Sequence, residues 1–396
     1  MRRRTGVLVV LLAVIAAIVA LVATTATAKT RHATGPASAG TATVSCGKTR
    51  TIGFMVPVTG PAASIGGQQA DWAKAYVATF NRTHKTKVKL QIEDTILGAP
   101  NGTAEALKGA QALVSNPKVL GVVGPAGSNE IVGVTKTLKD GGLAWVSGSS
   151  TRTSLTTDGT RTGFMFRTVP PDAVQGTTAA NYMLSKLKVK KVYIIDDQET
   201  YSTGLADTVE GKLKSKNVSV SRDGVSQQQS DFSSLISKIA RDTDLVYIPW
   251  QLAPKGKAFG QQMKSAGKGS IKIMGADGLF DPDFAGVGTN IYDTNFPLNA
   301  KSPIITKFKK AHGGSGEYFG APTYAATQVV ATAVQKACAS GSTTRAKVRA
   351  AIQATSIAAK ASLLGVRLRF NRNGDLSTLH KFGIYKSNGK DFVPIG

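Results

Sequence analysis

The chain has 396 residues, of which 42% are hydrophobic, and it carries a formal net charge of +25 at pH 7. This length suffices for about two domains with cores of their own, and the apolar fraction excludes an intrinsically disordered chain. The lysines and arginines are scattered along the chain rather than gathered with aromatic residues, which argues against a nucleic-acid partner. We therefore expect a globular protein with a solvated basic surface that suits an anionic envelope.

The N-terminus has the features of an export signal. Three arginines within residues 1–4 precede an uncharged apolar stretch, 6–23, and Ala26-Thr27-Ala28 follows it as at a secretory cleavage site. We expect residues 1–28 to be a signal peptide, whose removal with its three arginines lowers the net charge from +25 to +22. The mature chain would lie outside the cytoplasmic membrane, whether periplasmic, cell-wall-associated or secreted. An uncleaved anchor is the alternative, because the apolar stretch approaches the roughly 20 residues that a membrane span needs.

Residues 29–45 and the two cysteines predict a tether and a disulfide. Thr, Ala, Ser and Gly dominate residues 29–45, so we expect a flexible tether there. Cys46 and Cys338 are the two cysteines, and an even pair in an exported chain suggests a disulfide. Two alternatives stay open, namely lipid attachment at Cys46 and a pair of buried free thiols.

From residue 51 onward, short β-branched runs alternate with longer segments of helical period, which is typical of mainly parallel sheets covered by helices. The first series consists of strands 51–58, 88–93, 119–123 and 143–147 and helices 65–81, 104–114 and 129–139. After the turn Val169-Pro170-Pro171-Asp172, the second series consists of strands 191–196, 218–222, 245–249 and 271–274 and helices 201–215, 231–241 and 255–265. Helices at 303–312, 323–339 and 344–353 and a strand with a turn at 366–375 complete the chain. The pattern predicts an α/β fold with two doubly wound, Rossmann-like lobes.

Polar residues follow two strands of the first series. Ligands bind doubly wound sheets outside the carboxyl ends of the strands, so two facing lobes would hold a ligand in the cleft between them. Ser128 follows the third strand, and Ser150 and Thr151 follow the fourth within WVSGSSTRTSLTTDGT, residues 145–160. Their hydroxyl and N–H groups can bind an anion. The plainer alternatives are helix capping by Ser128 and an ordinary polar turn for the other two.

Two residues of the second series also stand at strand exits. Tyr201 enters a helix after the strand 191–196 and can cover an apolar ligand group. Asp277, in Met274-Gly275-Ala276-Asp277-Gly278, suits an ammonium group. A tyrosine half-buried at a helix start and an aspartate that serves only its turn are the alternatives.

Four segments, in order and spacing, resemble the type I periplasmic-binding proteins of branched-chain amino acid ABC transporters. These segments are IGFMVPVTGP at 52–61, VVGP at 122–125, DQETYSTG at 197–204 and MGADG at 274–278, and the resemblance covers about residues 48–390. It implies a three-stranded hinge with crossings near Thr168, Phe296 and Leu364. Lobe 1 would then consist of residues 46–168 plus 297–363, and lobe 2 of residues 169–296 plus 364–396.

The resemblance also implies roles for single residues. The ligand's α-carboxylate would be held by Ser128, Ser150 and Thr151, and its α-ammonium by Asp277, which is shorter than the family's usual glutamate. Tyr201 matches the family's aromatic residue of lobe 2, and Phe319 lies near an aromatic of the pocket wall. Two departures alter the side-chain pocket: Ile65 replaces a common aromatic, and Trp250-Gln251 stands where tyrosines are frequent.

These features predict a monomeric solute-binding protein that needs no cofactor, closes its lobes on an amino acid or a related amide or carboxylate, and delivers it to an ABC permease. An exported hydrolase is disfavoured, because the sequence has no G-x-S-x-G elbow, no metal or nucleotide motif and no histidine after a predicted sheet strand. A repressor of related fold is disfavoured by the export signal and the missing N-terminal DNA-binding helix pair. A sensor for a signalling partner stays an alternative, because its ligand-binding lobes would look the same.

Overall fold

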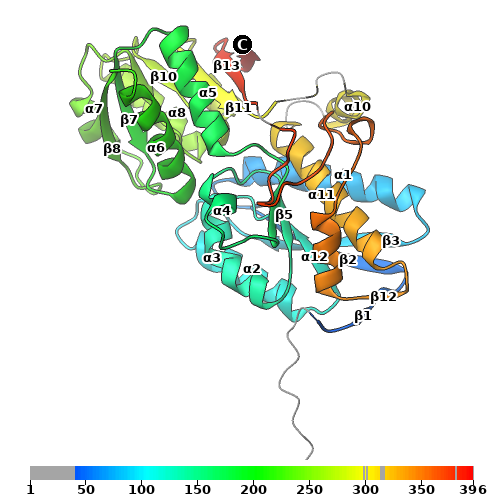
Figure 1. The fold of residues 1–396 in the computed structure, drawn as a ribbon. Coiled ribbons are helices and arrows are strands. Elements are labelled where there is room, and N and C mark those ends of the chain that lie inside the picture. Colours follow the sequence, from blue (N-terminus) through cyan, green and yellow to red (C-terminus); the bar gives the residue numbers. More distant parts are fainter. Residues whose placement is uncertain (1–40, 298, 300–301, 313–316, 380, 396) are drawn as a thin grey trace, which may run out of the picture. The chain divides into compact units, whose positions relative to one another are not determined.

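The computed structural model describes residues 41–297, 299, 302–312, 317–379 and 381–395 (Figure 1). These residues belong to one compact unit, Ala37–Gly396, which is distinct from Met1–Pro36. The expected signal peptide and most of the expected tether lie outside the described residues. Within the described part, none of the helices combines the length and the apolar character that crossing a membrane requires.

Lobe 1 is built on a five-stranded parallel sheet with the strand order β3-β2-β4-β5-β6. Its strands are β2 (Thr49–Val56), β3 (Lys87–Asp94), β4 (Val119–Val123), β5 (Trp145–Ser147) and β6 (Met165–Arg167). Phe54 and Val56 pack into the core on one face, and Met55 packs into the core on the other, because successive strand residues point to opposite faces. The first face is covered by α1 (Ala63–Thr83), α11 (Glu317–Ala337) and α12 (Arg345–Gln353), and the second by α2 (Gly102–Ser115) and α3 (Ser128–Asp140).

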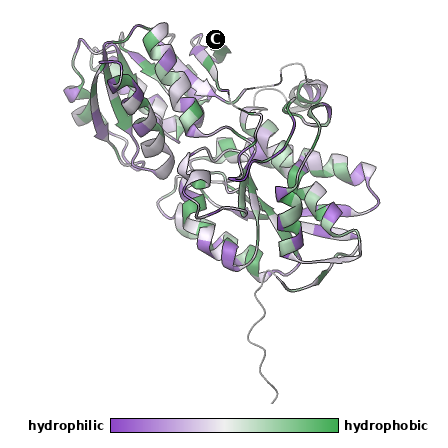
Figure 2. Ribbon diagram, in the orientation of Figure 1, coloured by the Kyte–Doolittle hydropathy of each residue, from purple (hydrophilic) through white to green (hydrophobic). Residues whose placement is uncertain are grey.

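Lobe 2 is built on a seven-stranded sheet with the order β14-β13-β11-β10-β9-β7-β8, in which only the pairings of β13 are antiparallel. Its strands are β7 (Lys191–Asp196), β8 (Ser219–Gly224), β9 (Leu245–Tyr247), β10 (Lys272–Met274), β11 (Ile291–Asn295), β13 (Gly383–Ser387) and β14 (Phe392–Pro394). One face packs on α5 (Asp172–Ser185) and α6 (Thr200–Lys214), and the other on α7 (Ser233–Lys238), α8 (Ala253–Ser265) and α9 (Pro282–Ala285). Hydrophobic residues dominate the central strands of both sheets (Figure 2). The predicted α/β fold with two doubly wound lobes is confirmed.

The chain after α12 packs differently from the expected boundary at residue 364. Leu368, Phe370, Leu376 and Leu379 belong to the core of lobe 1, and the chain reaches lobe 2 only at β13. The reason is the turn at 371–374, whose Gly374 lies against β6 with φ +98°; a Cβ there would come within 2.1 Å of the Met165 carbonyl oxygen. Residues 364–379 therefore belong with lobe 1.

Several elements were not expected from the sequence. Helix α5 and strands β6, β11, β13 and β14 had no counterpart in the expected pattern, and α7 is shorter than the helix expected at 231–241. Strand β1 (Val44–Ser45) pairs with β12 (Ser342–Thr343), so the end of the expected tether is a strand. The remaining elements are α4 (Ser154–Thr157), α10 (Pro303–His312) and two short 3-10 helices, η1 (Asp277–Leu279) and η2 (Ala359–Ala361).

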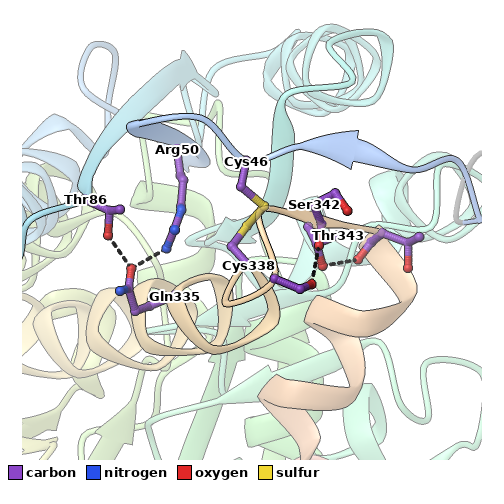
Figure 3. The surroundings of a disulfide bond; sticks show 9 residues. Cys46, Arg50, Thr86, Gln335, Cys338, Ser342 and Thr343 are labelled. Carbon is purple, nitrogen blue, oxygen red and sulfur yellow. Dashed lines mark hydrogen bonds between the residues drawn. A yellow bond between two sulfur atoms is a disulfide. The ribbon is translucent and has the colours of Figure 1, made fainter.

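A disulfide joins Cys46 to Cys338, as predicted, with a Cα–Cα distance of 5.8 Å (Figure 3). Both cysteines are buried in the core of lobe 1. Beside them, the Gln335 side-chain oxygen accepts hydrogen bonds from the Thr86 hydroxyl, at 2.7 Å, and from the Arg50 guanidinium (Figure 3). The disulfide therefore ties the beginning of lobe 1 to its helix α11, and the free-thiol and lipid-attachment alternatives are wrong.

Candidate ligand-binding site

A cavity with about 300 Å³ of space not filled by atoms, part of it open to solvent, lies where the carboxyl ends of strands from both sheets meet. Lobe 1 and lobe 2 both contribute to its wall. Its lining contains six of the eight residues predicted to bind ligand and four others: Ile65, Ser128, Tyr201, Gln251, Asp277 and Phe319, with Leu97, Ala126, Ser149 and Gly278. Ser150 and Thr151 do not line it.

The serines after β5 mainly hold two loops of lobe 1 together. The Ser147 hydroxyl donates to the Pro125 carbonyl at 2.7 Å, and the hydroxyls of Ser149 and Ser150 donate to the Ala126 carbonyl at 2.7 and 2.9 Å. Ser150 is 1% exposed, so its hydroxyl serves the loop, whereas Ser149 forms part of the cavity wall. The structure thus places Ser149 where the sequence suggested Ser150.

Ser128 does not cap its helix. The N-cap of α3 is Gly127, whose N–H donates to the Glu130 carboxylate at 2.7 Å, while the Ser128 hydroxyl oxygen accepts from the Arg152 N–H at 3.3 Å. The capping alternative is therefore wrong. In this arrangement the Ser128 hydroxyl proton stays available to an acceptor in the cavity.

Arg167 supports the loop after β5 from behind. This guanidinium is 0% exposed and donates to the carbonyls of Thr151 and Arg152 at 2.8 and 2.9 Å. It also pairs with Asp375 of the C-terminal turn at 2.5 Å. A fully buried arginine with this many partners fixes the loop geometry before any ligand arrives.

Thr151 faces Asp172 at the start of α5. Its side chain is 0% exposed and its hydroxyl has no partner in hydrogen-bond geometry, although it lies near enough to the Asp172 carboxylate to lower the pKa of that group. Burial and repulsion by Asp277 outweigh this effect and raise the pKa of Asp172 to about 7. Thr151 thus lies outside the cavity wall, next to Asp172.

Asp277 and Tyr201 form one unit in lobe 2. The Tyr201 hydroxyl donates to the Asp277 carboxylate at 2.7 Å, and both side chains are almost completely buried. Burial raises the pKa of Asp277 to about 6, although hydrogen bonds from Tyr201 and Gln175 act in the opposite direction. Among the described residues, no lysine or arginine forms an ion pair with Asp277. Its charge therefore lacks a cationic partner within the described part of the chain.

A second and a third buried carboxyl lie close to Asp277. Burial and the charge of Asp277 raise the pKa of both Asp172 and Asp293, and the carboxylate oxygens of these two residues have no hydrogen-bond partner. The three groups do not form a metal site, since no cluster of His, Cys, Asp and Glu in the described chain has a geometry that could hold a metal ion. Lobe 2 consequently buries a group of three carboxyls, of which Asp277 lines the cavity.

The apolar part of the wall lies next to the connections between the lobes. Ile65 and Phe319 pack in one cluster with Val169, Phe296 and Phe382. The last three residues lie on the three chain segments that run between the two sheets, β6 to α5, β11 to α10, and the segment before β13. Ligand contacts at Ile65 and Phe319 would thus act directly on these connections.

Direct contacts between the lobes close the cavity. The Arg152 guanidinium donates to the Thr203 hydroxyl at 3.0 Å and to the Thr200 carbonyl. The Gln228 amide donates to the Gly98 carbonyl at 3.2 Å. Leu252 of lobe 2 packs with an apolar group of lobe 1 that consists of Ala62, Leu97 and Ala126.

This arrangement, a cavity at the strand ends of two doubly wound sheets joined by three connections, is matched by a known family. The model of the periplasmic binding protein family matches residues 49–390. The chain belongs to this family. It is a binding protein, and the family is not one of enzymes.

Three similar proteins illustrate the periplasmic binding protein family. The Leu/Ile/Val-binding protein BraC3 of Rhizobium johnstonii is 29% identical over 301 residues, which cover 72% of this chain and 79% of the relative. A leucine-, isoleucine-, valine-, threonine- and alanine-binding protein of Pseudomonas aeruginosa is 26% identical over 345 residues, 85% of this chain and 89% of the relative. The structure of LivJ from Streptococcus pneumoniae in complex with isoleucine superposes with a TM-score of 0.73 at 22% identity, covering 88% of this chain and 100% of that chain. At this identity the LivJ structure shows a shared fold.

Sequence reasoning missed Asp172, Asp197, Leu97 and Arg167. Asp172 could have been found, because a Pro-Pro-Asp sequence is a common helix start, but the following small and polar residues conceal α5. Asp197 stands beside Asp196 at a recognised strand exit. Nothing in the local sequence distinguishes Leu97 or Arg167, whose roles depend on contacts with residues far away in the chain.

Proposed function

We propose that this periplasmic binding protein captures an α-amino acid in the cavity described above and delivers it to an ABC permease. The observation that carries this proposal is the buried Asp277 carboxylate, which lacks a cationic partner and shares the cavity with Ser128 of lobe 1. An α-ammonium group would supply the missing charge, and the Ser128 hydroxyl with the loops after β4 and β5 would bind the α-carboxylate.

Closure around the ligand follows from this division of the site. The carboxylate-binding groups belong to lobe 1 and the ammonium-binding group belongs to lobe 2, so a bound amino acid stabilises the closed arrangement by contacting both. The three connections between the sheets would be the hinge. The names of the relatives support an amino acid as ligand, and the N-terminal sequence together with the family supports a place outside the cytoplasmic membrane.

The test is a thermal-shift screen of the purified mature chain with each of the 20 protein amino acids, an α-hydroxy acid that lacks the ammonium group, and an amine that lacks the carboxylate. A ligand at 100 times its Kd stabilises the native state by about 2.7 kcal/mol. We expect at least one amino acid to raise the Tm and its two truncated analogues to fail. If no amino acid raises the Tm, the proposal is wrong.

A further inference from the structure

A second and larger cavity adjoins the first. It has about 880 Å³ of space not filled by atoms, part of it open to solvent. Residues 97–100, 102, 103 and 129 of lobe 1 form one side, and residues 197–199 and 226–228 of lobe 2 form the other. The hydrogen bond from the Gln228 amide to the Gly98 carbonyl, at 3.2 Å, joins the two sides.

The two cavities share their walls. Leu97 lines both of them. Gln251, which lines the first cavity, accepts a hydrogen bond from the Gln227 amide at 3.2 Å and donates its backbone N–H to Asp197 at 3.1 Å. The Gln227 amide also donates to Asp197, at 2.9 Å. A ligand side chain that leaves the first cavity past Leu97 and Gln251 therefore meets Gln227 and Asp197.

The second cavity is negatively charged. Its described lining contains two carboxylates, those of Asp197 and Glu199, and neither a lysine nor an arginine. Asp197 is 3% exposed, and burial raises the pKa of its carboxyl to about 6 despite its hydrogen bonds from Gln227 and Gln251. One lysine, Lys255, borders a small neighbouring hollow that shares Asp197, but its ammonium donates to the carbonyls of Gln228 and Gln229.

This negative charge contrasts with the far edge of the lobe 2 sheet. That edge, where the parallel strands begin, is rich in lysine and arginine: Lys186, Lys188, Lys190, Lys191, Lys214, Lys216, Arg241, Lys268 and Lys272. In a chain of net charge +25, a cavity whose described charged groups are all acidic is a local reversal of sign. Such a field attracts cations and repels anions as they approach.

We propose that the second cavity holds the side chain of the bound amino acid and that this side chain ends in a cation, as in lysine, ornithine or arginine. The inference rests on the proposed function, because the headgroup must occupy the first cavity for the side chain to enter the second. The stem would pass Leu97, since methylene groups pack on apolar surface while the charged end stays among polar groups. Asp197 and Glu199 would bind the terminal cation, and Gln227 would hold Asp197 in position.

A cation fits this cavity better than a neutral side chain. A buried carboxylate without a cationic partner is costly, and a charged donor that reaches it recovers more free energy than a neutral amide does. A leucine side chain would instead leave the two carboxylates uncompensated. Ile65 and Gln251, which stand where related proteins often have aromatic residues, are consistent with a cationic side chain. Neither is an aromatic residue that would fill the space around an aliphatic side chain.

The experiment is isothermal titration calorimetry of the mature chain with two matched pairs, lysine against norleucine and arginine against citrulline. Norleucine keeps the four side-chain carbons of lysine but lacks the terminal ammonium, and citrulline keeps the length of the arginine side chain but is uncharged. The same titrations are made with Asp197→Asn and Glu199→Gln. Asp242→Asn is the control, because it removes one carboxylate at the opposite edge of the sheet, where the Asp242 side chain is 75% exposed.

We expect lysine or arginine to bind at least tenfold more tightly than its neutral partner. Asp197→Asn should abolish this preference, while Asp242→Asn should change neither affinity. If norleucine and citrulline bind as tightly as lysine and arginine, or if Asp197→Asn leaves the preference intact, the inference is wrong and the proposed function stands. If none of the four ligands binds and the 20-amino-acid screen is also negative, the proposed function itself fails.

Discussion

The two halves of the ligand cavity are built on opposite principles. In the loop after β5 of lobe 1, the hydroxyls of Ser147, Ser149 and Ser150 donate to backbone carbonyls, and the buried Arg167 holds the loop in place. In lobe 2 the carboxyls of Asp172, Asp277 and Asp293 are buried together, and two of them have no hydrogen-bond partner at all.

This difference indicates how each lobe would contribute to the free energy of ligand binding. The polar groups of the lobe 1 loop are already held in place by hydrogen bonds. Ligand binding to this lobe therefore requires little rearrangement of the loop. Lobe 2 buries carboxyl groups whose ionisation costs stability, as their raised pKa values indicate, and a ligand cation would relieve that cost. Replacing a polar group should therefore destabilise the fold in lobe 1 and stabilise the unliganded fold in lobe 2.

Arg167→Met tests the lobe 1 half and should have the largest effect. The substitution keeps an apolar stem but leaves Asp375 without its cation and removes one of the donors to each of the carbonyls of Thr151 and Arg152. Breaking a buried ion pair in this way costs about 3–5 kcal/mol of unfolding free energy, which urea denaturation measures. Arg349→Met, at a position outside this network, is the control. A loss below about 1 kcal/mol for Arg167→Met would show that the loop does not depend on the guanidinium.

Asp277→Asn tests the lobe 2 half through ligand affinity. The amide is similar in shape, accepts the Tyr201 hydrogen bond and removes the charge that the ligand ammonium would need. Losing one partner of a buried charge pair costs about 2–5 kcal/mol, so calorimetry should show a Kd roughly 30-fold to several-thousand-fold higher. Asp283→Asn, an exposed acid six residues further on, should bind normally. An unchanged Kd for Asp277→Asn would remove the ammonium assignment.

The pH dependence of the stability of Asp172→Asn tests directly whether ionisation of a buried carboxyl in lobe 2 costs stability. The folded pKa of Asp172, about 7, lies above the value of an exposed aspartate, so the unfolded chain releases this proton first and the native state loses stability as pH rises from about 4 to 7. Without ligand, the variant should equal the native chain near pH 4 and exceed it by on the order of 2–4 kcal/mol above pH 7. Urea denaturation at several pH values gives the comparison. A variant less stable than the native chain at pH 8 would show that Asp172 is paired after all.

Ser150→Ala should have the smallest effect, on both stability and binding. It removes a hydrogen bond to the Ala126 carbonyl, which is worth about 0.5–1.5 kcal/mol of unfolding free energy, and it should change the ligand Kd by less than about threefold. Ser128→Ala, in the cavity wall, should raise the Kd by about tenfold. If the order of the two affinities were reversed, Ser150 would be a ligand residue, as the sequence suggested.

The sequence predicted the regular part of this molecule well. Strands β4 and β7 begin and end at the predicted residues, because their hydrophobic runs are bounded by clear turn signals. Helix α5, in which small and polar side chains predominate, gave no such contrast. The boundary at residue 364 differs because the close approach of Gly374 to the Met165 carbonyl depends on tertiary contact, which no local pattern reveals.

For the site, the sequence predicted which loops at the carboxyl ends of strands contribute. It could not show which of several neighbouring residues in one loop lines the cavity. Ser149 and Ser150 are adjacent serines, and only the fold decides which of them lines the cavity. Asp277 was found because its position carries the family resemblance. The negative charge of the second cavity was not predicted, because Asp197 and Gln227 are 30 residues apart and become neighbours only through the pairing of β7 with β8.

The disulfide also fixes an order of assembly. Cys46 precedes Cys338 by 292 residues, and the whole chain of lobe 2 up to β11 lies between them. Cys46 is therefore synthesised long before its partner, and the chain of that insert is complete when Cys338 follows. The disulfide of lobe 1 can form only after α11 has been made. Its presence therefore shows that the chain up to Cys338 is in place.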